Sequence, residues 1–431
     1  MSKYDKASLV HIPSGYKNGT LYNVLPNDAD GDFDFTRAST ATRVNKDGLI
    51  ETIATGTPRL DYPLLDGVVQ DNPTLLLEPQ STNLIADSDD LTGFSFSNGA
   101  IDLNSGIAPD GTNTAIKFKD NSIGSVGAVR VFNTYTVSTS TNYQMSVFMK
   151  AGSLNYGMLR TGGFTTPADG NTIFDLNNGT IYSQYVAHTR ASIENYGNGW
   201  YRCSIGFTTD SSDTSGNFVI SLADAGTQNV PRNGTSNILI WGAQFEEGSY
   251  PTSYIPTSGS SVTRSADVCN GAEADFNSSE GVLYANVSAL ADDDTTRRLS
   301  ISDGTNDDRV LIGYSSSDRL QYVVSGGGTV FVNKLITVSD ITLPTKTAFK
   351  YKLNDCAVWI NGFEVDTDTS ASMPSTLNTL NFDQANGTED FYGKTKEVIA
   401  FNEALSDTEL EALTSYDSFT EMATEQLYTI E

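Results

Sequence analysis

Alternating apolar and polar residues run through the middle of the chain. Residues 143–149, 201–207 and 217–222 carry an apolar side chain at about every second position. A period of two places these side chains on one face of a β-strand. Asn-Gly and Asp-Gly pairs, which favour tight turns, separate the runs at Asn98-Gly99, Asp110-Gly111, Asn178-Gly179, Asn198-Gly199 and Asn233-Gly234. The pattern predicts a two-sheet jelly roll or sandwich over residues 85–257.

A second set of apolar runs extends over residues 262–404. Its clearest members are residues 281–287, 309–314, 320–324, 348–352, 356–360 and 397–401. Asn361-Gly362 directly follows the run that contains Trp359, and this pair predicts a β-hairpin. Residues 250–261, rich in Pro, Ser and Thr, lie between the two sets and indicate a linker or a domain edge.

Helix signals follow the last apolar run. Residues 406–409 read Ser-Asp-Thr-Glu, which is the pattern of a capping box, and Leu410 and Leu413 then fall on one side of the predicted helix. Residues 418–421 repeat the pattern and predict a second short helix, with Leu427 among its apolar positions.

Proline is concentrated in the first 84 residues, which hold six of the 13 prolines. Proline has no N–H to donate to a β-ladder, so long central strands are not expected there. We predict an extended arm with little β-structure of its own, packed either on the next domain or on a neighbouring subunit. The predicted fold is therefore all-β, with two tandem β-sandwich or jelly-roll domains after an extended N-terminal arm and short C-terminal helices. The predicted divisions are 1–84, 85–257 and 258–431.

Charge and cysteine content narrow the classes of partner. The chain has 53 Asp and Glu against 26 Lys and Arg, a formal net charge of −27, so we expect no nucleic-acid partner. It has no stretch of about 18 apolar residues, so we expect no membrane insertion. Cys203, Cys269 and Cys356 are odd in number and widely spaced, and no secretory signal is evident. These features predict buried free thiols and folding in a reducing cytoplasm.

Residues 345–415 resemble the end of a concanavalin A-like, or laminin-G-type, lectin sandwich. The resemblance is carried by residues 358–362 (Val-Trp-Ile-Asn-Gly) and by the strand 391–401, which precedes Leu-Ser-Asp-Thr-Glu at residues 405–409. It implies a lectin-like domain at the C-terminal end.

Residues 85–257 resemble a carbohydrate-binding-module-like jelly roll. The segments that carry this resemblance are residues 199–204 (Gly-Trp-Tyr-Arg-Cys-Ser) and 240–248 (Ile-Trp-Gly-Ala-Gln-Phe-Glu-Glu-Gly), followed by residues 250–257. The resemblance implies a second module of a kind that binds sugars.

The order of segments resembles structural proteins of tailed bacteriophages, through residues 34–44, 58–62 and 75–85. The resemblance implies a virion surface location, on a fibre or as a capsid or tail decoration, with synthesis in the host cytoplasm. An arm without its own core needs a surface on which to bury its apolar residues, which predicts capsid or tail proteins as partners and a homo-oligomer, with a trimer as one option. The candidate attachment residues are Phe35, Arg37, Arg43, Leu75, Leu76 and Leu77.

Catalysis by an imidazole-activated nucleophile would need His11 or His188, and neither lies near a Gly-x-Ser-x-Gly elbow. Glycoside hydrolysis needs two facing carboxylates. Glu246 and Glu247 are the best-placed pair, but adjacent residues of a strand point to opposite faces. We therefore expect no enzymatic activity.

Calcium is the one metal that the sequence suggests, at the alternating carboxylates Asp28, Asp30 and Asp32. An EF-hand loop has glycine at its sixth position, whereas Gly31 is fourth here, so a solvated acidic turn is favoured and we expect no cofactor.

Sugar rings stack on exposed aromatic side chains that have polar groups nearby. Tyr156, Tyr182 and Tyr196 lie beside polar turns and are the candidate glycan-binding residues, whereas the three tryptophans lie in strand runs and are expected in the core. The preferred function is a bacteriophage virion surface protein that attaches by its arm and displays lectin-like modules to host or environmental glycans. A purely structural capsid or tail auxiliary protein without a glycan ligand is the alternative, and a glycan-degrading tail enzyme is a weaker one.

Overall fold

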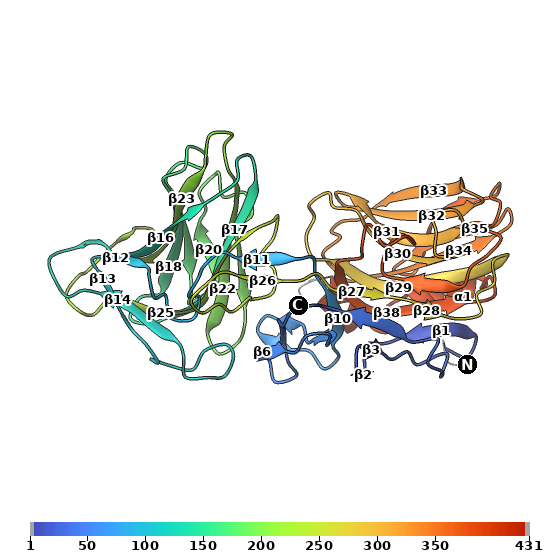
Figure 1. Cartoon of the computed structure of the whole chain (residues 1–431), viewed down its shortest axis with the longest axis horizontal. Coiled ribbons are helices and arrows are strands. Elements are labelled where there is room, and N and C mark those ends of the chain that lie inside the picture. Colours follow the sequence, from blue (N-terminus) through green and yellow to red (C-terminus); the bar gives the residue numbers. More distant parts are fainter. Residues whose placement is uncertain (1–3, 427–431) are drawn as a thin grey trace.

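The computed structural model describes residues 4–426, which form two β-rich bodies side by side (Figure 1). Every ladder that joins two named strands is antiparallel, and the two helices lie near the C-terminal end. The predicted all-β fold of tandem sandwiches with short C-terminal helices is confirmed. Within residues 4–426, no helix is long and apolar enough to cross a membrane.

The first body is a sandwich of two six-stranded sheets. The β18 sheet has the order β12-β16-β23-β18-β19-β20, and these strands are Ser95–Ser97, Arg130–Thr136, Ser215–Ala223, Tyr156–Gly162, Gly170–Asp175 and Thr180–Ser183. The β17 sheet has the order β13-β14-β25-β17-β22-β21, and these strands are Gly99–Asp102, Ile116–Asp120, Asn237–Glu247, Asn142–Ala151, Trp200–Thr208 and Ser192–Asn195. A short ladder of β15 (Gly127–Ala128) and β24 (Asn229–Val230) lies beside them.

Period-two alternation explains the core of this sandwich. On β17, Met145, Val147 and Met149 point between the sheets, where they join Ile205 of β22 and Phe245 of β25 in one buried cluster. The polar or aromatic residues between them point outward from the sheet.

The second body is also a two-sheet sandwich. Its larger sheet has the order β36-β35-β34-β29-β38-β10-β7, with β1 also pairing β38; these strands are Phe363–Asp368, Cys356–Ile360, Thr345–Lys352, Glu280–Ala289, Gly393–Phe401, Thr74–Leu77, Arg59–Asp61 and Ala7–His11. The facing sheet has the order β28-β37-β30-β31-β32-β33, and these strands are Ala272–Glu273, Thr379–Asn381, Arg297–Ser302, Arg309–Ser316, Arg319–Gly326 and Thr329–Thr337. The predicted hairpin after Trp359 joins β35 to β36, with Asn361 and Gly362 both at positive φ.

The N-terminal arm differs from its prediction. It contains eleven short strands, β1 to β11, and three of them are part of the larger sheet of the second body. β1 and β10 pair with successive parts of one edge of β38, at Val10 opposite Ile399 and at Leu75 opposite Thr395. The arm pairs here because this edge of β38 would otherwise present unpaired N–H and C=O groups. The apolar residues of the arm also complete the core beneath the sheet. The surface that the arm needs belongs to the last domain of the same chain.

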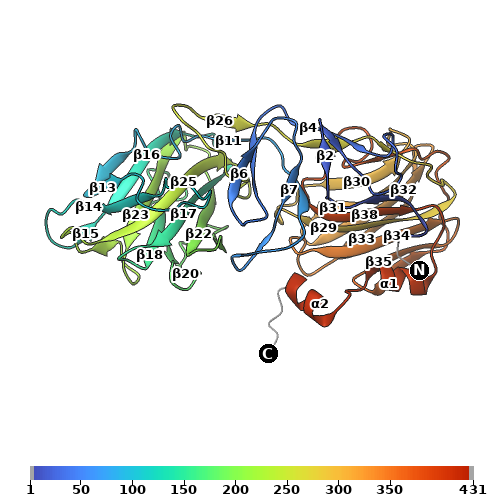
Figure 2. The same cartoon turned by 90° about the horizontal axis from the view of Figure 1, so that it is seen from below.

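Other parts of the arm lie between the two bodies, where Figure 2 shows β6 and β7. The hairpin of β5 (Ala41–Val44) and β6 (Ile50–Ile53) contacts the first body, because Ile50 N–H donates to the Pro109 carbonyl at 3.0 Å. The remaining short strands of the arm and its partners are β2 (Tyr16–Lys17), β3 (Thr20–Leu21), β4 (Phe33–Thr36), β8 (Leu64–Leu65), β9 (Val68–Val69), β11 (Ser81–Asn83), β26 (Val262–Arg264) and β27 (Val268–Asn270). β11 pairs with β26, so the two chain segments that connect the bodies are hydrogen-bonded to each other.

Both C-terminal helices begin at the predicted capping boxes. α1 (Asp407–Thr414) follows Ser406, whose backbone N–H donates to the Glu409 carboxylate at 2.9 Å, and Leu410 and Leu413 are buried. α2 (Phe419–Glu425) is tied down by an ion pair of 2.8 Å between Lys346 and Glu421. The predicted apolar position Leu427 lies outside the described residues.

Candidate functional site: a cleft between the two bodies

A cleft of about 580 Å³ lies at the junction of the two bodies. Its walls include arm residues 42–66, the β21–β22 hairpin and the β19–β20 turn of the first body, linker residues 250–254, and the ends of β29 and β38 in the second body. Sites for small ligands are commonly concave and lie where domains meet. We refer to it as the interbody cleft.

Four half-buried tyrosines line the interbody cleft: Tyr62, Tyr196, Tyr201 and Tyr250. Burial raises the pKa of Tyr196 and of Tyr250, so both phenols stay protonated at neutral pH and can donate a hydrogen bond. Tyr196 packs edge-on against Phe148, with ring centroids 4.9 Å apart, and this contact holds it on the wall. The cleft therefore offers aromatic faces and hydroxyl groups together.

Charged and amide groups complete the lining. Asp61 accepts the Val44 N–H at 2.9 Å, and Lys394 lies 3.4 Å from its other carboxylate oxygen. Arg43 pairs with Glu51 at 2.7 Å near the rim. The Asn195 amide donates to the Asp66 carboxylate at 3.1 Å and so ties the first body to the β8–β9 hairpin. The cleft therefore presents both hydrogen-bond donors and acceptors.

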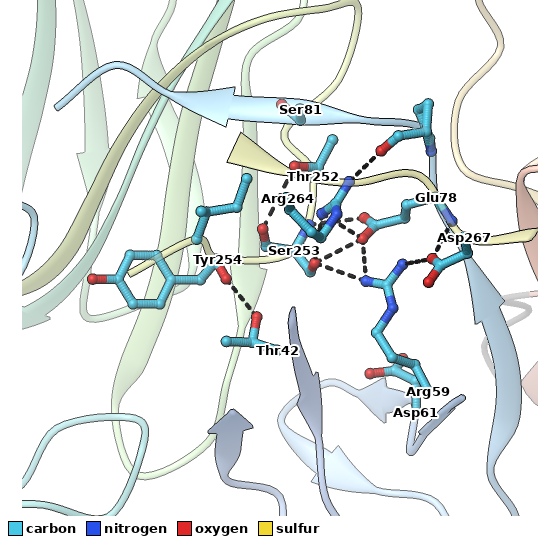
Figure 3. A network of polar contacts seen from close by, with 12 residues as sticks. Thr42, Arg59, Asp61, Glu78, Ser81, Thr252, Ser253, Tyr254, Arg264 and Asp267 are labelled. Atoms are coloured by element: carbon cyan, nitrogen blue, oxygen red, sulfur yellow. Dashed lines mark hydrogen bonds and ion pairs between the residues drawn. The ribbon is translucent and has the colours of Figure 1, made fainter. Parts of the chain in front are cut away.

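A buried network of five charged residues, which we call the junction network, lies beside the cleft. Figure 3 shows four of them, Arg59, Glu78, Arg264 and Asp267. Arg59 of β7 pairs with both Glu78 and Asp267, and Arg264 of β26 pairs with Glu78 at 2.7 Å. Arg37 adds a bond of 3.1 Å to the second oxygen of Asp267. Charges taken out of water need partners of this quality, because their desolvation is otherwise costly.

The junction network also binds the linker between the bodies. Ser253 donates from its backbone N–H to Glu78 at 2.8 Å and from its hydroxyl to the same carboxylate at 2.7 Å. Burial alone would raise the pKa of Glu78, but Arg264 and Arg59 hold it well below its usual range. Glu78 and Ser253 also line the cleft, so the network and the cleft share a wall.

The three tyrosines predicted to bind glycans do not form one site. Tyr196 lies in the interbody cleft. Tyr156 and Tyr182 lie together on the outer face of the β18 sheet, with ring centroids 5.3 Å apart and planes at 75°. Trp200, Trp241 and the third tryptophan, Trp359, are buried, which confirms their predicted place in the core.

The predicted attachment residues are used within the chain. Phe35, Leu75 and Leu77 are buried in the core of the second body, and Leu76 is buried on the cleft side. Arg37 belongs to the junction network and Arg43 is half-buried at the cleft rim. Five of the six are thus buried rather than free to bind another protein, because the arm folds onto its own chain. This differs from the expectation of an attachment surface built from them.

The histidines and candidate carboxylates have structural surroundings. His188 lies buried between the hydroxyls of Thr161 and Thr172, at 3.0 and 2.8 Å. Glu246 is buried and accepts bonds from Ser81 and Thr252, whereas Glu247 is exposed on the other side of the strand, as predicted. All three cysteines are buried and free, as expected.

The acidic turn considered for calcium does not gather its carboxylates. Asp28 accepts the Gly31 N–H at 3.1 Å, and Asp32 accepts the Asn23 N–H at 2.7 Å, while Asp30 is exposed. Within residues 4–426, no group of three or more His, Cys, Asp or Glu side chains is arranged to hold a metal ion.

Sequence reasoning missed most of the cleft. Tyr62 and Tyr250 are each followed by a proline, Pro63 and Pro251, at the places where the chain passes between the bodies. A tyrosine followed by proline at a domain joint was a usable signal. Lys394 and Asp61 carried none, because their proximity depends on β10 lying between β7 and β38.

No protein-family model and no curated protein matches the chain. Among solved structures, it is similar to the CBM40 of the Ruminococcus gnavus IT-sialidase bound to α2,3-sialyllactose, with 14% identity over 32% of this chain and 84% of that chain and a TM-score of 0.29. It is also similar to domains LG4-5 of the mouse laminin α1 chain, with 9% identity over 75% of this chain and 95% of that chain and a TM-score of 0.22. For a Trypanosoma rangeli sialidase in complex with sialic acid, identity is 11% over 93% of this chain and 82% of that chain, with a TM-score of 0.27. Similarity at this level does not place the chain in a family.

Proposed function

We propose that this chain is a non-enzymatic glycan-binding protein of a virion surface and that the interbody cleft is its glycan site. The observation that carries the proposal is the lining of the cleft, in which four half-buried tyrosines lie beside carboxylate, ammonium and amide groups. Aromatic faces stack on the apolar side of a sugar ring, and the polar groups bond its hydroxyls. The two sandwiches serve as a scaffold that holds this lining.

The bacteriophage part of the proposal is supported by the resemblance of the segment order to tailed-phage structural proteins. Attachment to capsid or tail proteins then uses residues other than the five buried ones named above. Mass spectrometry of purified particles tests the location, and cross-linking identifies the protein that the arm contacts. Absence of the chain from purified particles would remove the virion assignment and leave the glycan site untouched.

A glycan array probed with the intact chain tests the binding site. We expect Tyr62→Ala and Tyr250→Ala to lose at least tenfold in affinity for the best glycan, because one stacked ring contributes about 1.5 kcal/mol. Tyr22→Ala is the matched control, since Tyr22 is 40% exposed and lies outside the cleft lining. If the two cleft variants bind like the control, the cleft is not the site.

A structural auxiliary protein is the second candidate, and the junction network favours it. Five buried charges and three arm strands fix the junction between the bodies, which suits a rigid spacer on a particle. An intact chain that binds no glycan on the array, yet is present in stoichiometric amounts on particles, would establish this role.

We also propose that binding occurs without catalysis. Both histidines are buried and hydrogen-bonded inside the fold, so neither reaches a cleft ligand. Incubation of the bound glycan with the chain, followed by chromatography of the sugars, is the test. Release of shorter products would refute it and support a glycan-degrading enzyme.

A further inference from the structure

Two arginines share the outer face of the β18 sheet. Arg130 of β16 pairs with Ser221 of β23, and Arg160 of β18 pairs with Val219 of the same strand. Residues directly opposite each other in an antiparallel ladder point to the same face, so both arginines lie on the face away from the core. The intervening Leu159 and Ile220 are buried between the sheets, which confirms this orientation.

The two arginines differ in whether a carboxylate forms an ion pair with them. Arg160 pairs with Asp169 and also donates to the Asn171 side chain at 3.2 Å. Arg130 donates from Nη2 to the Gln228 side-chain oxygen at 2.6 Å, and within residues 4–426 no carboxylate forms an ion pair with it. Its pKa is lowered by burial and by the positive charge of Arg160. The charge of Asp169, which pairs directly with Arg160, acts on the pKa of Arg130 in the opposite direction.

Unpartnered polar atoms lie beside this arginine. Ser221 is fully buried in the strand between the two arginines, and its hydroxyl has no hydrogen-bond partner among the described residues. The Nε of Arg130 is likewise buried without an acceptor there. Buried polar groups usually have partners, so this part of the sheet is an exception to that rule.

An aromatic pair lies on the same face, toward the other end of β18. Tyr156 precedes Arg160 by four residues, which places their Cα atoms about 13 Å apart along the strand. Tyr182 packs against Tyr156 and is 51% exposed. Asp175 is directly opposite Tyr156 in the ladder, so this end of the face is aromatic and acidic while the other end is basic.

We propose that this outer face is a second binding site, specific for a sugar chain that carries a carboxylate. The carboxylate binds Arg130 and Arg160, because a guanidinium group donates two parallel hydrogen bonds to that acceptor. The neighbouring ring, which is neutral, stacks on Tyr182. The site lies on the outer face of the β18 sheet, which meets the interbody cleft only at the turn of Asn178 and Gly179, and it goes beyond the function proposed above.

The probe is a matched pair of oligosaccharides that differ only in oxidation at C6, one containing glucuronic acid and one containing glucose in its place. Affinity is measured on the intact chain by calorimetry, and the variants are Arg130→Gln and Arg160→Gln. Arg319→Gln is the control, because Arg319 is exposed on β32 of the second body and its loss makes the same change in net charge. Melting temperatures establish that each variant is folded.

We expect the acidic oligosaccharide to bind at least tenfold more tightly than the neutral one. Each variant in the pair should abolish that preference, and the control should keep it. Arg130→Lys, which keeps the charge without the bidentate geometry, should retain only part of the preference. Equal affinity for the two oligosaccharides would overturn the proposal, as would an unchanged preference in either arginine variant. Loss of the preference in Arg319→Gln would also overturn it, because the effect would then come from net charge. The cleft variants Tyr62→Ala and Tyr250→Ala should leave the preference for the acidic oligosaccharide intact. The proposal for the cleft and the proposal for the outer face can therefore be refuted independently.

Discussion

Replacing Glu78 by glutamine should destabilise the junction between the two bodies more than any surface change of the same kind. Glu78 is buried and accepts from two arginines and from Ser253. The substitution keeps the shape of the side chain and removes one negative charge. The junction network then holds three arginines against the single carboxylate of Asp267, so its excess of positive charge rises from one to two.

The expected size follows from this count. Breaking a buried ion pair by removing one partner costs about 3–5 kcal/mol. The loss of unfolding free energy for Glu78→Gln should be near the upper end of this range, because both Arg59 and Arg264 lose the carboxylate of Glu78. The loss of unfolding free energy for Arg59→Met should be about 3 kcal/mol. After that change Asp267 still has Arg37 and Glu78 still has Arg264. The order of the two losses is therefore part of the prediction.

Urea denaturation followed by tryptophan fluorescence measures the change, with Glu51→Gln as the matched control. Glu51 pairs with Arg43 at 2.7 Å near the surface, and such pairs contribute about 0.2–1 kcal/mol. Lowering the pH gives an independent readout. The pKa of Glu78 is depressed in the fold, so its stabilisation is complete above about pH 4.5 and is lost as the pH falls below that value. The gap between the wild-type chain and Glu78→Gln should close in acid. A loss for Glu78→Gln no larger than that for Glu51→Gln would refute the reasoning.

Three further predictions concern the histidines, the arm and calcium. Burial lowers the pKa of His11 and of His188 from 6.5 to about 4, so these histidines take up protons at a higher pH in the unfolded chain than in the folded one. The free energy of unfolding should therefore fall as the pH falls from about 6.5 to 4, by up to about 3 kcal/mol for each histidine. His188→Asn should flatten this part of the pH profile, and an unchanged slope would contradict the assignment. Leu75→Ala should cost about 2–5 kcal/mol in urea melts, because Leu75 is fully buried in the second body, and a loss below 1 kcal/mol would show that the arm is peripheral. Millimolar calcium should leave the melting temperature unchanged, and a saturable rise that is lost in an Asp28→Asn, Asp32→Asn variant would show a site in the acidic turn.

His11 shows why the pH prediction has a structural basis. Its Nδ1–H donates to the Asn23 side-chain oxygen at 2.7 Å, and its Nε2 is buried with no partner among residues 4–426. The rings of Phe33 and Phe382 pack edge-on against the imidazole. A second proton would therefore place a charge in an apolar surrounding with no acceptor, and the fold opposes that protonation.

Local signals in the sequence were sufficient to predict the individual strands, turns and helices. They were not sufficient to predict how the two bodies and the arm meet. The alternation around Met145, the Asn361-Gly362 turn and the capping box at Ser406 each depend on residues within a few positions of one another, and each has the predicted structure. The pairing of Leu75 with Thr395 joins residues 320 positions apart and leaves no local trace. Proline content argued only against long central strands, and the strands of the arm are two to five residues long.

The same distinction separates the two candidate sites. Tyr156 and Tyr182 could be proposed from the sequence because each lies beside a polar turn, and pairing of β18, β19 and β20 then brings them together. The cleft could not be predicted from the sequence, because its walls come together only when strands of the N-terminal arm pair with β38, near the C-terminal end of the sequence. Long-range pairing thus hides a site from sequence analysis more effectively than weak local propensity does.

The junction network gives the cleft a shape that does not depend on a ligand. Glu78 accepts from Arg59 in the arm, from Arg264 in the strand that enters the second body and from Ser253 in the linker, so one carboxylate ties together three segments that would otherwise pivot. A wall that is already fixed loses little conformational freedom when a sugar binds, which improves affinity without any new contact. Tyr250 lies three residues before Ser253 in the linker that this bond holds. Changes to Glu78 should therefore weaken binding at Tyr250 before they unfold either sandwich, whereas the arginine face on the β18 sheet, which shares no residue with the network, should keep its affinity.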